Sequence, residues 1–284
     1  MKNADEVNEE LRNWRQGDVI GNAALPFLYF CDAHLPLTSE AQEEVTNQPA
    51  AADDGLDLRS IAVEPPGFVV LTQTCDLVRD CRERPFVELS PLIQVSQDDL
   101  LDIEKGIRPI YASIPSQVAK ALVADLDRSM TVEKAVLANL PKDSHVAGFD
   151  DDGELRKFAR AIARKKMRYA FPDDFIAAVR PFQEHIKKKH GKDSPQGRFL
   201  STVREIRVKV APNWTDVESL TFYFLLQDGA LPNKELTEEA KKLVERIKPG
   251  TKYSDSNFRV VSPEQMSVAA YLTSDQLDLD HLSY

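Results

Sequence analysis

A short polar segment that follows an apolar run carries the side chains best suited to chemistry. Phe68–Leu71 is apolar, and a cluster of hydroxyl, amide, thiol and carboxylate groups comes directly after it. Active-site residues often stand where a rigid strand passes into a loop, because the strand fixes the start of the loop. We therefore interpret four residues of this segment as candidate catalytic residues: Thr72, Thr74, Cys75 and Asp76.

Cys75 would act as a nucleophile only with a base to deprotonate it. No histidine lies near it in the sequence, so His34, His145 or His185 would have to reach it through the fold. The alternative is a structural cysteine, with Asp76 and the threonines bonding to backbone groups of a turn. Both interpretations stay open at this point.

The three cysteines also suggest a metal site. Cys31-x-x-His34 and Cys75-x5-Cys81 provide four ligands in two pairs, and each pair follows an expected strand, so the set would suit tetrahedral zinc. The alternative is three free thiols in a reducing compartment. We expect no other cofactor, since the sequence contains no G-x-G-x-x-G, Walker A or G-x-S-x-G motif.

The charge is distributed unevenly. The net charge is −10, yet the segment 156–209 contains 16 Lys/Arg and 5 Asp/Glu. Basic runs in an acidic chain are typical of an anionic partner, most often RNA or DNA; the alternative is solvated helix faces opposite acidic surfaces of the same protein. The candidate nucleic-acid-binding residues are Arg160, Arg164, Lys165, Arg168, Lys187, Lys188 and Lys189.

The order of the expected elements favours an α+β architecture, because strands and helices do not alternate regularly. We predict a β-rich, barrel-like antiparallel region over 1–113, in which 68–72 pairs with 86–89 and 38–55 is a mobile insertion. A helical region follows over 114–284, with helices that begin near 116, 155, 172 and 235 and a β-hairpin over 203–226. The two regions could also form one domain.

Composition limits the class of protein. The chain is 42% hydrophobic and 29% charged, as expected for a globular protein with a core. No apolar run approaches the roughly 18 residues of a membrane span, and the N-terminus is charged, so we expect a cytoplasmic protein of prokaryotic type, without membrane partners.

Three segments of the N-terminal third are similar to those of a known family: Gly17–Ile20, Phe68–Thr72 and Phe86–Pro91. In this order they resemble the MazF/PemK-like toxins, small SH3-like barrels that cleave RNA without a metal. The resemblance implies that Thr72 and Ser90 lie near the cleft. Pro66-Gly67 stands where the family has Arg-Pro, the chain is more than twice as long, and the family's basic arginine has no counterpart that aligns.

Two functional hypotheses follow. The first is a nucleic-acid-interacting protein, in its enzymatic form a nuclease-like hydrolase of toxin or defence type, whose polar segment and basic residues share one concave surface. The second is a non-catalytic interaction or regulatory subunit, with or without a structural zinc. In that case the acidic 38–55 segment and the tail with Leu277, Leu279 and Leu282 would bind a protein partner.

Overall fold

The chain folds as two units, each with its own core, in a computed structural model that describes residues 2–21, 25–51, 55–104, 108–167, 169–253 and 255–277. The first unit is Met1–Met167 and the second is Arg168–Tyr284. The division predicted after residue 113 therefore falls inside the first unit. The reason is that β7 (Leu122–Asp125) pairs with β5 (Phe86–Gln94) and with β6 (Tyr111–Ser113).

The first unit is built on an antiparallel sheet with the strand order β6-β7-β5-β4-β1-β9, in which β8 also pairs with β5. The predicted pairing of 68–72 with 86–89 is confirmed by β4 and β5. The mixed α+β class is confirmed as well, but the sheet is open, and barrel closure is not observed. The remaining strands are β1 (Val19–Gly21), β4 (Gly67–Val70), β8 (Met130–Glu133) and β9 (His145–Val146).

β4 is buried on both faces, which explains its continuous apolar sequence. Phe68 and Val70 point into one core, whereas Val69 and the following Leu71 point into another. Residues of α1 (Ala4–Leu11) and α5 (Lys134–Ala138) belong to the first core, and Phe158 of α6 (Asp152–Lys166) belongs to the second. The helices thus enclose the sheet from two sides.

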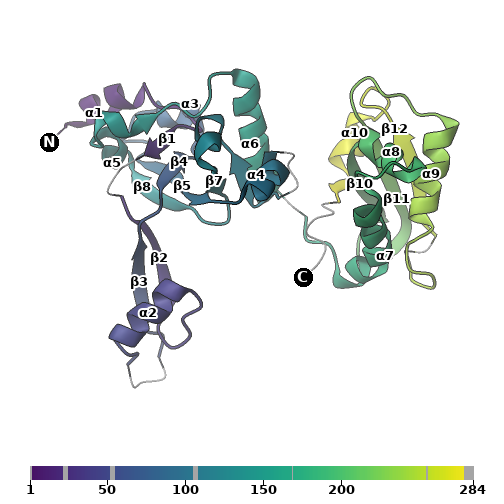
Figure 1. The fold of residues 1–284 in the computed structure, drawn as a ribbon, viewed down its shortest axis with the longest axis horizontal. Coiled ribbons are helices and arrows are strands. Elements are labelled where there is room, and N and C mark those ends of the chain that lie inside the picture. Colours follow the sequence, from purple (N-terminus) through teal and green to yellow (C-terminus); the bar gives the residue numbers. More distant parts are fainter. Residues whose placement is uncertain are drawn as a thin grey trace. The chain divides into compact units, whose positions relative to one another are not determined.

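A two-stranded hairpin extends from this unit (Figure 1). β2 (Phe27–Asp32) pairs with β3 (Leu58–Val63), and α2 (Ser39–Asn47) lies between them in the sequence. We call Phe27–Val63 the arm. The segment 38–55 was predicted as an irregular insertion, yet it contains α2, since Thr38 caps the helix and Ala41 is fully buried. Residues 52–54 of that segment lie outside the described residues.

Two further local predictions are wrong. The helix expected from Ser116 onwards is a 3₁₀-helix, η1 (Pro115–Lys120), which ends at Ala121 with φ of 52° and passes into β7. The strand expected to end at Ser90-Pro91 continues to Gln94, since Pro91 stands opposite Phe68 within the sheet. The other short elements are α3 (Thr74–Leu77), α4 (Gln97–Glu104) and η2 (Lys142–Ser144).

The second unit places three helices on one face of a four-stranded sheet with the order β12-β11-β10-β13. The predicted hairpin over 203–226 is present as β10 (Val203–Pro212) and β11 (Val217–Leu226). Phe182, Phe199 and Phe224 pack together in its core. The remaining elements are α7 (Asp173–Lys189), α8 (Pro195–Thr202), α9 (Lys234–Val244), β12 (Asn257–Val261), α10 (Val268–Leu272) and β13 (Asp275–Gln276).

Candidate functional site

The polar segment after β4 forms the short helix α3, and its hydroxyl groups bond to the backbone. The Glu88 N–H donates to Thr72 Oγ1 at 2.7 Å, and the Gln16 N–H donates to Thr74 Oγ1 at 3.1 Å. Both threonines therefore hold neighbouring chain segments in place. This is the structural role that the sequence left open beside the catalytic one.

A buried lysine fixes the other end of this segment. Lys134, at the start of α5, is 1% exposed, and its Nζ donates to the carbonyl oxygens of Asp76 and Arg79 at 2.8 and 2.7 Å. Burial lowers the pKa of Lys134. Nothing in the sequence indicated this role, because the two carbonyl groups lie 58 and 55 residues away.

Cys75 is exposed, and its thiol lies 3.6 Å from Gln73 Oε1. The Asp76 carboxylate lies 3.7 Å from Arg79 Nε, on the surface. Within the described parts of the chain, no hydrogen bond or ion pair joins either residue to a histidine. The geometry therefore does not support covalent catalysis by Cys75.

The four predicted zinc ligands do not form one group. Cys31 and His34 belong to the arm, Cys75 is on α3, and the Cys81 thiol lies 3.6 Å from the Ala4 carbonyl oxygen of α1. Across the described ranges, no three His, Cys, Asp or Glu side chains are arranged to hold a metal ion. The structure thus offers no geometric support for the zinc hypothesis.

Asp18, the residue before β1, bonds to His145 of β9, the strand at the edge of the sheet. Asp18 is 6% exposed and its carboxylate binds His145 Nε2 and the Arg15 N–H, both at 2.8 Å. Trp14 stacks on the His145 ring with centroids 4.1 Å apart. From the sequence, His145 was a candidate only as a base for Cys75. In the structure it is the partner of the buried Asp18 carboxylate.

The first basic run ends α6, and two of its lysines are engaged in long-range ion pairs. Lys165 binds Asp127, and Lys166 Nζ lies 2.7 Å from Glu88 Oε1. Arg168 lies outside the described residues. The second basic run belongs to the second unit, where it forms the last turn of α7: Lys187, Lys188 and Lys189.

A groove in the first unit is lined by three further cations of α6, Lys157, Arg160 and Arg164. Its volume is about 700 Å³, and α4, β6, η1 and α6 form its walls. Four basic side chains and two carboxylates line it, so positive charge dominates: Arg108, Lys157, Arg160, Arg164, Glu104 and Glu154. Of the predicted nucleic-acid-binding residues, the groove thus brings together Arg160 and Arg164 and adds Arg108 and Lys157.

The charges in the groove differ in how far they are neutralised. Arg108 binds Asp99, outside the groove lining, and Lys157 binds Glu154 at 2.5 Å. Among the described residues, no ion pair or hydrogen bond engages the Arg160 guanidinium, which leaves it available to an anion. Burial raises the pKa of the Tyr111 hydroxyl, so this group stays protonated and available as a hydrogen-bond donor.

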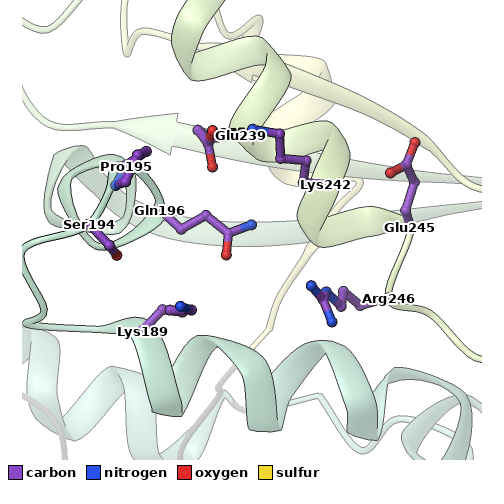
Figure 2. A pocket seen from close by; sticks show the side chains of 8 residues that line it. All are labelled: Lys189, Ser194, Pro195, Gln196, Glu239, Lys242, Glu245 and Arg246. Atoms are coloured by element: carbon purple, nitrogen blue, oxygen red, sulfur yellow. Dashed lines mark hydrogen bonds and ion pairs between the residues drawn. The ribbon is translucent and has the colours of Figure 1, made fainter.

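A second cavity, of about 490 Å³, lies in the second unit between α7, α8 and the end of α9. Figure 2 shows Lys189, Gln196 and Arg246 around the same opening. Its charges are more evenly balanced, because Lys242 binds Glu239 at 2.6 Å and Glu245 also lines the cavity. None of Thr72, Thr74, Cys75 or Asp76 lines either cavity, so the expected shared surface is not found at these two places.

Comparisons of the chain with family models, with curated proteins and with solved structures gave no match. No described helix is both long and apolar enough to cross a membrane. The groove in the first unit is therefore the feature that best indicates a function.

Proposed function

We propose that the first unit binds single-stranded nucleic acid through the groove beside α6. The proposal is carried by the four basic side chains that line the groove: Arg108, Lys157, Arg160 and Arg164. Among the described residues, Arg160 has no ion-pair or hydrogen-bond partner. Lys and Arg bind successive phosphates and release counterions, which gives affinity that falls with salt. Arg side chains suit this role because they donate two parallel hydrogen bonds to one phosphate.

The groove also has groups that favour a nucleic acid over a small anion. Tyr111 and Ser113 on β6 line it opposite the α6 residues, and the Tyr111 ring provides a face on which a base stacks. The groove has a volume of about 700 Å³, which is far more than a single inorganic anion fills. We expect weak sequence preference, because backbone contacts dominate such binding.

Fluorescence anisotropy with labelled single-stranded RNA and DNA tests the proposal. Arg160→Glu is expected to weaken binding at least about tenfold, since it replaces an attraction by a repulsion. Arg156→Glu is the matched control, because Arg156 lies on the same helix but does not line the groove. Equal loss in both variants would show that net charge, not the groove, determines binding.

Cleavage of the bound strand stays a separate hypothesis, which the resemblance to RNA-cleaving toxins suggested. It depends on Cys75 and Asp76, which lie on the surface after β4, and among the described residues neither of them bonds to a histidine. Incubation of RNA with the wild-type chain, Cys75→Ala and Asp76→Ala tests it. Identical RNA integrity in all three samples would remove the hypothesis and leave the binding proposal intact.

A further inference from the structure

The arm exposes more large apolar side chains than any other part of the described chain. Six of the sixteen exposed large apolar residues lie within these 37 residues. Their exposed fractions run from 52% to 83%: Leu28, Phe30, Leu35, Leu37, Leu56 and Leu58. Isolated exposed leucines are ordinary, but a cluster of this kind marks an interaction surface.

The strand register places three of these side chains on one face. Leu28, Phe30 and Asp32 are alternate residues of β2, so their side chains lie on one face. Leu58 of β3 pairs with Asp32 and therefore lies on the same face. The opposite face is covered, since Phe27 and Ile61 are 4% and 5% exposed and Tyr29 bonds to Thr38 beside α2. A two-stranded sheet is marginally stable with one face open. The covered face thus packs near Phe27 against a core of the first unit and near Thr38 against α2, and the open face has no such cover among the described residues.

The charge of the arm restricts the kinds of partner that could bind its open face. Between Phe27 and Val63 the sequence contains seven acidic residues and one basic residue, Arg59, which is paired with Asp57 at 2.8 Å. An anionic lipid surface or a nucleic acid would be repelled. A second copy of the arm would bring two strongly negative surfaces together, which opposes self-association.

We propose that the open face of the arm binds a basic amphipathic helix of a partner protein. The apolar side of that helix would cover Leu28, Phe30 and Leu58, and its flanking Lys/Arg would lie beside Asp32, which the register places on the same face of this negatively charged arm. Strands of six residues are about 20 Å long, which matches about 13 residues of helix. The partner helix then forms a third layer opposite α2.

Two synthetic peptides of about 18 residues test this with the full chain. Both place leucines on one helical face; one has lysines on the other face and the second has glutamates. The lysine peptide is expected to bind, with at least about tenfold weaker binding of the glutamate peptide. Phe30→Ser should reduce binding of the lysine peptide by at least about tenfold, whereas Leu231→Ser, which removes a side chain 68% exposed in the second unit, should not.

Asp32→Asn provides a second variant that keeps the apolar face and removes one charge from it, and several-fold weaker binding of the lysine peptide is expected. Unfolding midpoints equal to that of the wild type establish that the variants fold. Sedimentation of the chain without peptide tests the alternative that a second copy of the arm covers the open face. No binding, equal binding of both peptides, or a dimer that Phe30→Ser abolishes would overturn the proposal.

Discussion

Lys166, the last residue of α6, donates to both carboxylate oxygens of Glu88 on β5, at 2.7 and 2.9 Å. The Glu88 N–H in turn donates to Thr72 Oγ1, so one residue connects the basic helix to the segment that follows β4. Lys165 binds Asp127 in the same turn. These contacts fix the end of α6 against the sheet, and with it the position of the arginines that line the groove.

A double-mutant cycle measures this connection. Lys166→Met and Glu88→Gln each remove the ion pair, and the expected coupling free energy is about 0.2–1 kcal/mol, because the lysine is 51% and the glutamate 32% exposed. Urea unfolding of the two single variants and the double variant gives the value. A coupling of zero would mean that the pair does not hold α6 in place.

Lys134→Met is expected to destabilise the first unit by about 2–3 kcal/mol, because it leaves the carbonyl groups of Asp76 and Arg79 without their donor. Burial lowers the pKa of Lys134 from 10.5, so the folded chain loses this proton first, and its stability rises with pH up to that value. The free energy by which Lys134→Met destabilises the first unit should therefore be larger at alkaline than at neutral pH, and urea unfolding of both chains at the two pH values measures this difference. Loss of less than about 0.5 kcal/mol at neutral pH would contradict the structural role of Lys134.

Gly17→Ala should cost about 2–4 kcal/mol, since φ at Gly17 is +87° and an added Cβ would lie 2.3 Å from the Phe149 ring. Gly21→Ala is the matched control at the other end of the same strand, where nothing lies within 4 Å of the added atom. Thermal unfolding of both variants compares them. Similar midpoints would show that the turn before β1 is not as tightly packed as described.

The Asp57 carboxyl group should titrate far below its ordinary range. Its hydrogen bond to Arg59, followed by that from the Ala51 N–H, lowers its pKa from 3.8 to about 2. The charged pair therefore stabilises the arm above pH 3.8, and this contribution is lost as pH falls through about 2. Carboxyl NMR titration checks the value, and Arg59→Gln should raise the pKa; an unshifted wild-type midpoint would refute the pairing.

Local patterns predicted the elements that depend on local contacts. The apolar spacing in α6, α7 and α9 and the β-forming runs of β4 and β11 indicated these elements, because each has to bury a periodic face. The acidic and polar composition of 38–55 did not reveal the helix in this segment. α2 depends on its Thr38 cap and on the packing of Ala41, and composition shows neither. The helical conformation of this segment is therefore stabilised by contacts that depend on the fold.

The candidate site was only partly predictable for a related reason. Arg160 and Arg164 stood out because they belong to a basic run, whereas Arg108 and Tyr111 lie about 50 residues earlier in a segment without unusual charge. The same limit applies to Lys165 and Lys166. A sequence shows their charge but not the distant carboxylates that neutralise it.

The salt dependence of nucleic-acid binding tests the central claim most directly. For a single strand, each phosphate contact contributes about 0.7 to the slope of log K against log salt concentration, so Arg160→Ala should make the slope shallower by about that amount. Arg156→Ala, outside the groove lining, should leave it unchanged. No binding of the wild-type chain at about 50 mM salt, or an identical slope in all variants, would contradict the proposed groove.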